Sequence, residues 1–184
     1  TTMSRLSIPA VVDAPAASQP LLAVVHKKLG VVPNLMKLLG QSPAALEGYL
    51  SLSGALDKGV LNAKLRETLA LAVAEFNGCD YCLAAHSYIG KNLVKLTDDE
   101  IAQARDGRAA DARNDAALRF AQRVAAERGR VLDADIATLR AAGFSDAETV
   151  EIVLHVALNV LTNYVNNVAH TDVDFPRVSA HTHA

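Results

Sequence analysis

Apolar residues recur every three or four positions along most of the chain, the spacing that gives a helix one apolar face. Cap residues precede these stretches, and Gly or a polar turn follows most of them. Ser42-Pro43, Asn62, Thr97 with Glu100, and Ser145 with Glu148 are the clearest starts. These signals predict helices over residues 19–29, 34–39, 43–56, 63–76, 79–95, 98–106, 111–127, 133–142 and 146–169.

No segment alternates apolar and polar residues between hairpin turns, so the pattern favours an all-α bundle. Residues 1–18 are rich in small residues and Pro and show no helical period. We expect them to form an arm that packs on the surface or on a neighbour. Residues 19–176 are expected to be a single all-helical domain, and residues 177–184 a C-terminal tail.

Two of the predicted helices are apolar on nearly every side, the one through Leu69 and the one through Val160. A helix without a polar face belongs in a core. A small monomer has little surface with which to cover two such helices, so the pattern also predicts self-association into a homo-oligomer.

The composition agrees with a helical core, because 51% of the residues are hydrophobic and only 4% are aromatic. A formal charge of -2 without a basic stripe argues against nucleic acid as a partner. No apolar run reaches the ~20 residues that cross a bilayer, and no signal-peptide pattern opens the chain, so we expect no membrane insertion and a cytoplasmic location.

The two cysteines, Cys79 and Cys82, lie three residues apart. A disulfide between them would close too short a loop to stabilise the fold, so the pair indicates catalysis, redox sensing or metal binding. On a helix, Cys79, Cys82 and His86 share one stripe. The Asn77-Gly78 breaker also places Cys79 near a helix N-terminus, where free amides and the dipole favour a thiolate.

A Cys thiol with its ordinary pKa of about 8.5 is only slightly ionised at neutral pH, so a reactive cysteine needs a base or a positive potential. His86, one turn beyond Cys82, is a candidate base, and Glu67 is a candidate group to orient the imidazole. Simpler interpretations also stand. Glu67 could pair with Arg66 or be exposed, and the cysteines could be packed in the core as small hydrophobes. His86 could have a structural role.

The last predicted helix carries a polar stripe with steps of four, four, three and four residues. Buried amides need hydrogen-bond partners, so the stripe predicts either a seam between helices or subunits, or the wall of a pocket. Its members are His155, Asn159, Asn163, Asn166 and His170.

The run from Glu67 through Cys79-x-x-Cys82-x-x-x-His86 resembles the signature of the AhpD-like alkylhydroperoxidase branch of the carboxymuconolactone decarboxylase family. Val32-Pro33-Asn34-Leu35-Met36 and the region from Phe144-Ser145 through Phe175-Pro176 resemble its peroxidase-related members. The resemblance implies an AhpD-like helical bundle assembled as trimers or hexamers. It also implies an oxidoreductase that reduces small hydroperoxides through a cycling disulfide, which a small-molecule or protein thiol then reduces.

Carried over by position, Cys82 would be the peroxidatic thiolate and Cys79 the resolving thiol. Glu67 and His86 would form the proton relay. The helix dipole alone favours Cys79 as the more acidic thiol, whereas the resemblance assigns the reactive thiolate to Cys82. Tyr81 stands where some family members have a His, and a phenol is a poor base near neutral pH, so we expect a shorter relay and slower peroxidase turnover. Tyr81 is also a candidate pocket or interface residue.

Other functions remain as alternatives. A zinc site would use Cys79, Cys82 and His86 with His155 or His170, but structural zinc sites usually draw ligands from two separate knuckles. The ring-lactone decarboxylases of the resembled family lack the cysteine pair. A general disulfide reductase, or an oligomer that responds to redox state without turnover, would use the same thiols. We expect no cofactor and no metal.

Overall fold

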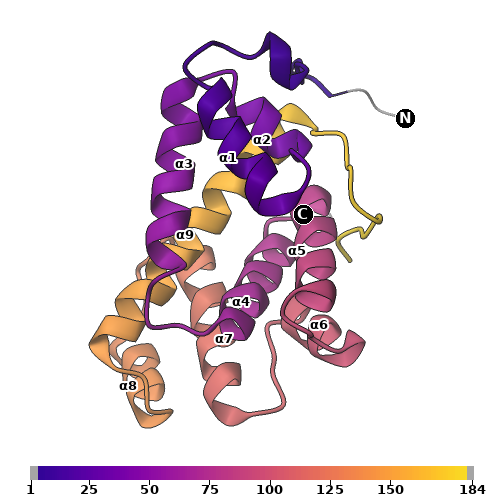
Figure 1. Ribbon diagram of the computed structural model, residues 1–184. Helices are drawn as coiled ribbons and strands as arrows, with labels where there is room; N and C mark the ends of the chain where they lie inside the picture. Colours follow the sequence, from indigo (N-terminus) through magenta and orange to yellow (C-terminus); the bar gives the residue numbers. More distant parts are fainter. Residues whose placement is uncertain (1–3, 182–184) are drawn as a thin grey trace.

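The computed structural model describes residues 4–181, which are helical with no strand among them, as predicted (Figure 1). Beyond a short 3-10 turn at Val11–Asp13 inside the predicted arm, the helix bounds follow the sequence pattern closely. The helices are α1 (Gln19–Leu29), α2 (Asn34–Leu39), α3 (Pro43–Leu56), α4 (Ala63–Phe76), α5 (Asp80–Asn92), α6 (Asp98–Arg105), α7 (Ala112–Ala126), α8 (Asp133–Ala141) and α9 (Asp146–Ala169).

Side-chain caps explain why the predicted starts agree with the structure. The Asn62 Oδ1 accepts from the Leu65 N–H at 2.9 Å, and Thr97 and Ser145 each form a capping box. The helix predicted over 79–95 is shorter, because Cys79 is its cap and the chain turns before Lys95. At that turn Lys95 has a φ of 61°, and the Leu96 N–H bonds back to the Gly90 carbonyl at 2.8 Å.

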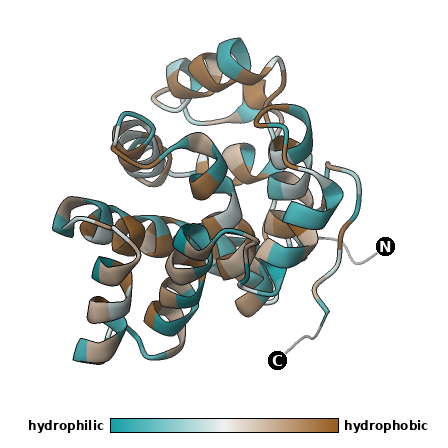
Figure 2. Ribbon diagram, turned by 90° about the horizontal axis from the view of Figure 1, so that it is seen from below, coloured by the Kyte–Doolittle hydropathy of each residue, from teal (hydrophilic) through white to brown (hydrophobic). Residues whose placement is uncertain are grey.

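Helix α4 lies at the centre of the bundle and contacts α5, α6, α7 and α9. Every residue from Leu69 to Ala74 is buried, as the sequence predicted for this segment. The expectation that α4 needs a second subunit to cover it is wrong, because its own chain surrounds it. The surrounding helices carry hydrophobic and hydrophilic residues on different sides (Figure 2).

Helix α9 is covered on one side only. Ile152 and Val156 are buried against the core, whereas an apolar row on the opposite side is exposed. The exposed row consists of Val150, Val153, Leu154, Leu161, Tyr164 and Val168.

The segment after α9 folds back across the ends of α2 and α5 (Figure 1). The Asn34 side chain donates to the Asp172 carbonyl at 3.0 Å, and the Ala180 N–H donates to the Asp80 carboxylate at 2.8 Å. The arm joins the same end, where the Arg5 N–H donates to the Ala169 carbonyl at 2.6 Å. Residues 1–3 of the predicted arm and 182–184 of the predicted tail lie outside the described part.

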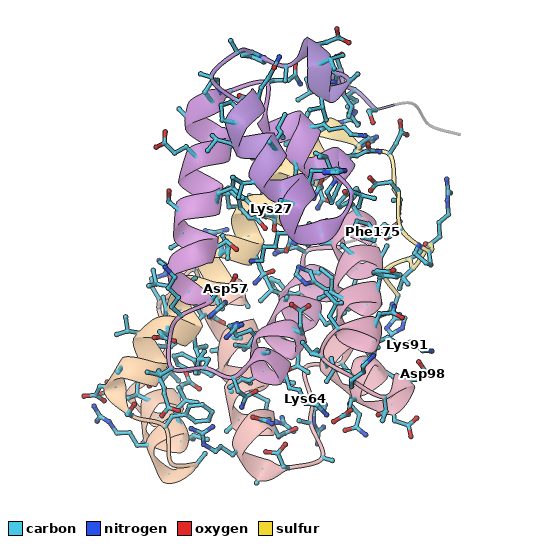
Figure 3. All side chains as sticks on the ribbon, viewed as in Figure 1. Lys27, Asp57, Lys64, Lys91, Asp98 and Phe175 are labelled. Carbon is cyan, nitrogen blue, oxygen red and sulfur yellow. The ribbon has the colours of Figure 1, made fainter. Side chains whose placement is uncertain are left out.

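Charges of opposite sign are paired over the surface. Lys91 and Asp98 form an ion pair of 2.7 Å between α5 and α6, and their side chains lie at the edge of the molecule (Figure 3). Lys28 pairs with Asp57 at 2.9 Å. None of the helices between residues 4 and 181 is both long and apolar enough to span a membrane.

Candidate active site

The two cysteines meet at the start of α5. The Gly78 φ of 60° lets the chain reverse after α4, and the Cys79 N–H bonds to the Ala74 carbonyl at 2.9 Å. The Cys79 Sγ then caps α5 by accepting from the Cys82 N–H at 3.3 Å. Both cysteines are unbridged, and their exposed fractions are 0% for Cys79 and 2% for Cys82. The breaker before the pair therefore brings the two thiols together.

His86 and Glu67 form a pair across α5 and α4. The His86 Nδ1 lies 2.8 Å from the Glu67 Oε2, and the side chains are 24% and 18% exposed. The alternative pairing of Glu67 with Arg66 is wrong, because Arg66 instead donates to the Leu61 carbonyl at 2.7 Å and lies 3.6 Å from Asp57.

Burial lowers the pKa of His86, but the charge of Glu67, the hydrogen bond to it and the charge of Cys82 raise it, and the net shift is upward. The imidazolium form is thus favoured beside the thiol. A protonated His86 is both a positive potential for the Cys82 thiolate and a proton donor.

Cys82 is the more acidic thiol of the two. Burial raises its pKa, but a hydrogen bond from Cys79, the charge of His86 and the amides of Asn163 and Asn166 lower it to about 7. The Asn166 Nδ2 donates to the Cys82 Sγ at 3.3 Å. The pKa of Cys79 is raised by its hydrogen bond to Cys82 and by burial. This order is the reverse of what the helix dipole alone predicts, because side-chain donors converge on Cys82.

The polar stripe on α9 divides into parts with different surroundings. Asn163 joins the helices near the thiols, since its Oδ1 accepts from the Asn77 Nδ2 at 2.9 Å. Asn159 bonds to its own helix through the His155 carbonyl at 2.8 Å. His155 is buried, and burial with the nearby Arg66 charge lowers its pKa. His170, at the end of α9, is exposed.

Tyr81 turns toward the C-terminal segment. Its hydroxyl donates to the Asp174 Oδ1 at 2.8 Å and accepts from the Leu35 N–H at 3.1 Å. Its ring packs edge-on against Phe175 with centroids 5.8 Å apart. Burial raises the pKa of Tyr81, so the phenol stays neutral. Tyr81 therefore joins α5, α2 and the C-terminal segment.

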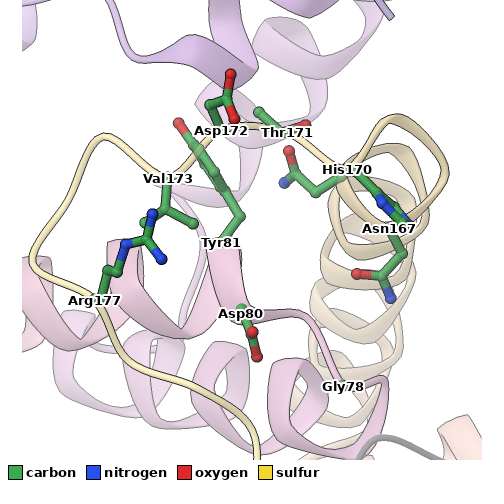
Figure 4. Close-up of a pocket in the computed structure, with 10 residues that line it drawn as sticks. Gly78, Asp80, Tyr81, Asn167, His170, Thr171, Asp172, Val173 and Arg177 are labelled. Carbon is green, nitrogen blue, oxygen red and sulfur yellow. The ribbon is translucent and has the colours of Figure 1, made fainter. Parts of the chain in front are cut away.

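A cavity of about 410 Å³ opens between the start of α5, the end of α9 and the C-terminal segment (Figure 4). Asn166 and His170 of the polar stripe and Tyr81 are among the residues that line it. The full lining is Gly78, Asp80, Tyr81, Asn166, Asn167, His170, Thr171, Asp172, Val173 and Arg177.

Sequence reasoning missed Tyr49 of α3, which the fold places near the thiols. Its pKa is raised to about 12 by burial and by the charge of Cys82, with smaller effects that include the charge of Glu67. The apolar stripe around Leu46 and Leu50 gave no sign of this position.

The zinc interpretation finds no support in the arrangement of side chains. Among residues 4–181, no three or more His, Cys, Asp or Glu side chains are grouped so that they could hold a metal ion. Cys79, Cys82 and His86 thus do not form such a group in the described part of the chain.

Residues 43–127 match the model of the carboxymuconolactone decarboxylase family. This stretch runs from α3 to α7 and contains Glu67, Cys79, Cys82 and His86. Over this stretch the chain is similar to that family. Two solved structures extend the likeness beyond the matched stretch and relate the chain to AhpD-like members.

The first structure is an alkylhydroperoxidase AhpD core, a peroxidase-related protein from Ralstonia eutropha JMP134. It shares 28% identity at a TM-score of 0.83, over 95% of this chain and 94% of its own. The second is a peroxidase-related protein from Silicibacter sp. TM1040, with 25% identity and a TM-score of 0.81 over 94% and 92% of the two chains.

A Haemophilus influenzae protein of uncharacterized role is 46% identical over 48 residues. The aligned segment is 26% of this chain and spans only 42% of that relative's length. The likeness is therefore local, and the activity of the whole protein has to be argued from the site.

Proposed function

We propose that the chain is a thiol-dependent peroxidase that reduces hydroperoxides through a Cys79/Cys82 dithiol–disulfide cycle with a Glu67/His86 proton relay. The observation that carries the proposal is the arrangement at the start of α5, where the Asn166 amide donates to the Cys82 sulfur and His86 is held by Glu67. The charge of His86 contributes to the lowered pKa of Cys82. The match of residues 43–127 to the family model and the likeness to the two peroxidase-related solved structures support it.

In the first step the Cys82 thiolate attacks the terminal oxygen of the hydroperoxide. The O–O bond breaks, Cys82 becomes a sulfenic acid, and the leaving alkoxide takes a proton from His86. Glu67 holds the imidazole through its 2.8 Å contact and stabilises the positive charge before transfer. The products of this step are an alcohol and the oxidised Cys82.

In the second step the Cys79 sulfur attacks the Cys82 sulfenic acid. The S–O bond breaks, water leaves with the Cys79 proton, and a disulfide joins the two residues. An external dithiol then reduces this disulfide by exchange and becomes a disulfide itself. Free thiols ready for this cycle suit a reducing compartment, and we place the protein in the cytoplasm.

The experiment that tests this function is mass spectrometry of the protein after one equivalent of hydroperoxide. We expect a loss of two hydrogens and a peptide that links Cys79 to Cys82, with continuous peroxide consumption when a dithiol is present. Absence of the link would reject the cycle. A link without turnover would instead favour the redox-responsive oligomer, and reduction of disulfide substrates without peroxide consumption would favour the disulfide reductase.

We also propose that the protein forms a homo-oligomer, a trimer or a hexamer, through the exposed apolar row on α9. Its residues from Val150 to Val168 recur at helical spacing on one face. Contiguous apolar surface of this kind usually marks an interaction site in a water-exposed protein. A second copy of the same helix face would be complementary in its apolar character.

Replacing Leu161 with Glu is expected to weaken self-association by at least about tenfold, because a charge would have to be buried at the contact. Light scattering coupled to size exclusion would show a lower assembled mass at equal concentration. The matched control is Leu93→Glu, which also replaces an exposed Leu but lies at the C-terminal end of α5. An unchanged mass for Leu161→Glu would place the contact elsewhere.

A further inference from the structure

The cavity beside the thiols ends at the amide of Asn166. That side chain lines the cavity and donates from Nδ2 to the Cys82 Sγ at 3.3 Å. Gly78 and Tyr81, which flank Cys79 and Cys82 in the sequence, belong to the same wall. Because the two cysteines are 0% and 2% exposed, any substrate has to approach Cys82 through adjoining space. The cavity provides that space, because the Asn166 side chain that lines it also contacts the Cys82 sulfur.

Two residues of the cavity lining each carry a buried polar atom without a hydrogen-bond partner among the described residues, the Asn166 Oδ1 and the Thr171 Oγ1. The residues are only 3% and 7% exposed. A buried polar group left without a partner costs about 1–3 kcal/mol. Such atoms in a binding site are commonly satisfied by the ligand, and these two require a ligand that offers hydrogen-bonding groups.

The rest of the lining is polar as well. Figure 4 shows Arg177 of the C-terminal segment on one side of the cavity and Asn167 and His170 of the α9 end on the other, with Asp80 and Tyr81 between them. Val173 is the only aliphatic side chain of the lining. A long acyl chain would meet polar groups along this wall and would leave them desolvated without partners.

We propose that this cavity receives the hydroperoxide and selects small hydroperoxides with polar substituents over those with large apolar groups. This inference rests on the proposed peroxidase function. The Asn166 Oδ1 accepts the O–H of the hydroperoxide while its Nδ2 holds the sulfur, so one amide brings the terminal oxygen to Cys82. That proton stays on the oxygen that Cys82 takes up. The Thr171 hydroxyl binds the polar substituent.

The first test compares hydroxymethyl hydroperoxide with cumene hydroperoxide. We expect the wild-type kcat/KM to be at least about tenfold higher for the polar substrate. Thr171→Val is expected to raise KM for hydroxymethyl hydroperoxide about fivefold, because the loss of one hydrogen bond weakens binding by about that factor. The preference for this substrate over cumene hydroperoxide should therefore decrease. The melting temperature should not fall, because the lost hydroxyl has no partner in the described protein.

The matched control is Thr162→Val on α9, which removes a buried hydroxyl that bonds to the Asn159 carbonyl at 3.0 Å. It should leave the preference between the two substrates unchanged. A preference that survives in Thr171→Val, or a wild-type enzyme that favours cumene hydroperoxide, would overturn the proposed selectivity.

The second test needs no peroxide. Val173→Trp fills part of the cavity and is expected to slow alkylation of Cys82 by iodoacetamide at least about fivefold, as measured by peptide mass spectrometry. Asp172→Trp, on the exposed wall, serves as a second plug if Val173→Trp loses helix content. Unchanged alkylation in folded plug variants would overturn the route while leaving the peroxidase function standing. Slowed alkylation in a protein without peroxide turnover would retain the route and reject the function.

Discussion

Replacing Cys82 with Ser is expected to lower peroxide turnover by at least about a thousandfold, because the attacking nucleophile is lost. A Ser hydroxyl at this position would remain protonated at neutral pH, even beside His86 and Asn166. The measurement is the rate of peroxide consumption under a dithiol reductant. A variant that keeps wild-type turnover would remove Cys82 from the mechanism.

Cys79→Ser is the matched variant, because it leaves the nucleophile in place and removes only the resolving thiol. We expect one equivalent of peroxide to be consumed rapidly and Cys82 to remain as a sulfenic acid, which dimedone would trap for mass spectrometry. Steady-state turnover should then depend on direct attack by the external thiol. Trapping of a sulfenic acid on Cys79 in Cys82→Ser, together with retained turnover, would reverse the roles of the two cysteines.

The helical framework of the site was predictable because its determinants are local. Asn62 opens α4 and Gly78 ends the turn before α5, so the sequence alone places Glu67 and the cysteine pair on successive helices. The spacing of Cys82 and His86 also places both on one helix face. These features need no knowledge of how the helices pack.

The partners of these residues were less accessible to sequence reasoning. Glu67 had equally reasonable partners in Arg66 and His86, and only the packing of α4 on α5 decided between them. The amides of Asn163 and Asn166 reach Cys82 from α9, which is distant in the sequence. The relative acidity of the two thiols depends on these donors, so an argument from the helix dipole alone gave the wrong order.

The cavity depends on tertiary structure even more strongly. The lining residues Thr171, Asp172, Val173 and Arg177 come from a segment without periodicity. Hydrogen bonds from Asn34 of α2 and Tyr81 of α5 set its position. Self-association was also difficult to predict from the sequence, because it depends on how the helices pack. The α4 and α9 patterns were equally apolar, yet α4 is covered by its own chain and α9 keeps an exposed row.

Glu67→Gln is expected to shift the pH dependence of the Cys82 thiolate upward. The wild-type pKa of about 7 depends partly on the charge of His86, whose own pKa is raised by the Glu67 carboxylate. Without that carboxylate, His86 is more often neutral and stabilises the thiolate less. The pKa of Cys82 should then move toward the ordinary thiol value of about 8.5.

The pH profile of iodoacetamide alkylation at Cys82 measures this shift directly. In the wild type the rate should rise with pH through about 7, since only the thiolate reacts and it forms as the pH increases past the pKa. At pH 7 the Glu67→Gln rate should be roughly tenfold lower, and the two rates should converge above about pH 9.5, where Cys82 is ionised in both proteins.

The control for this experiment is Glu75→Gln, which also changes a largely buried carboxylate of α4 that is engaged in an ion pair. Glu75 pairs with Arg105 at 2.7 Å and has no contact with His86. Its loss should leave the alkylation midpoint in place even if stability falls, because the His86 charge is untouched. A midpoint that moves equally in both variants would mean that general electrostatics, and not the Glu67–His86 pair, sets the acidity of Cys82.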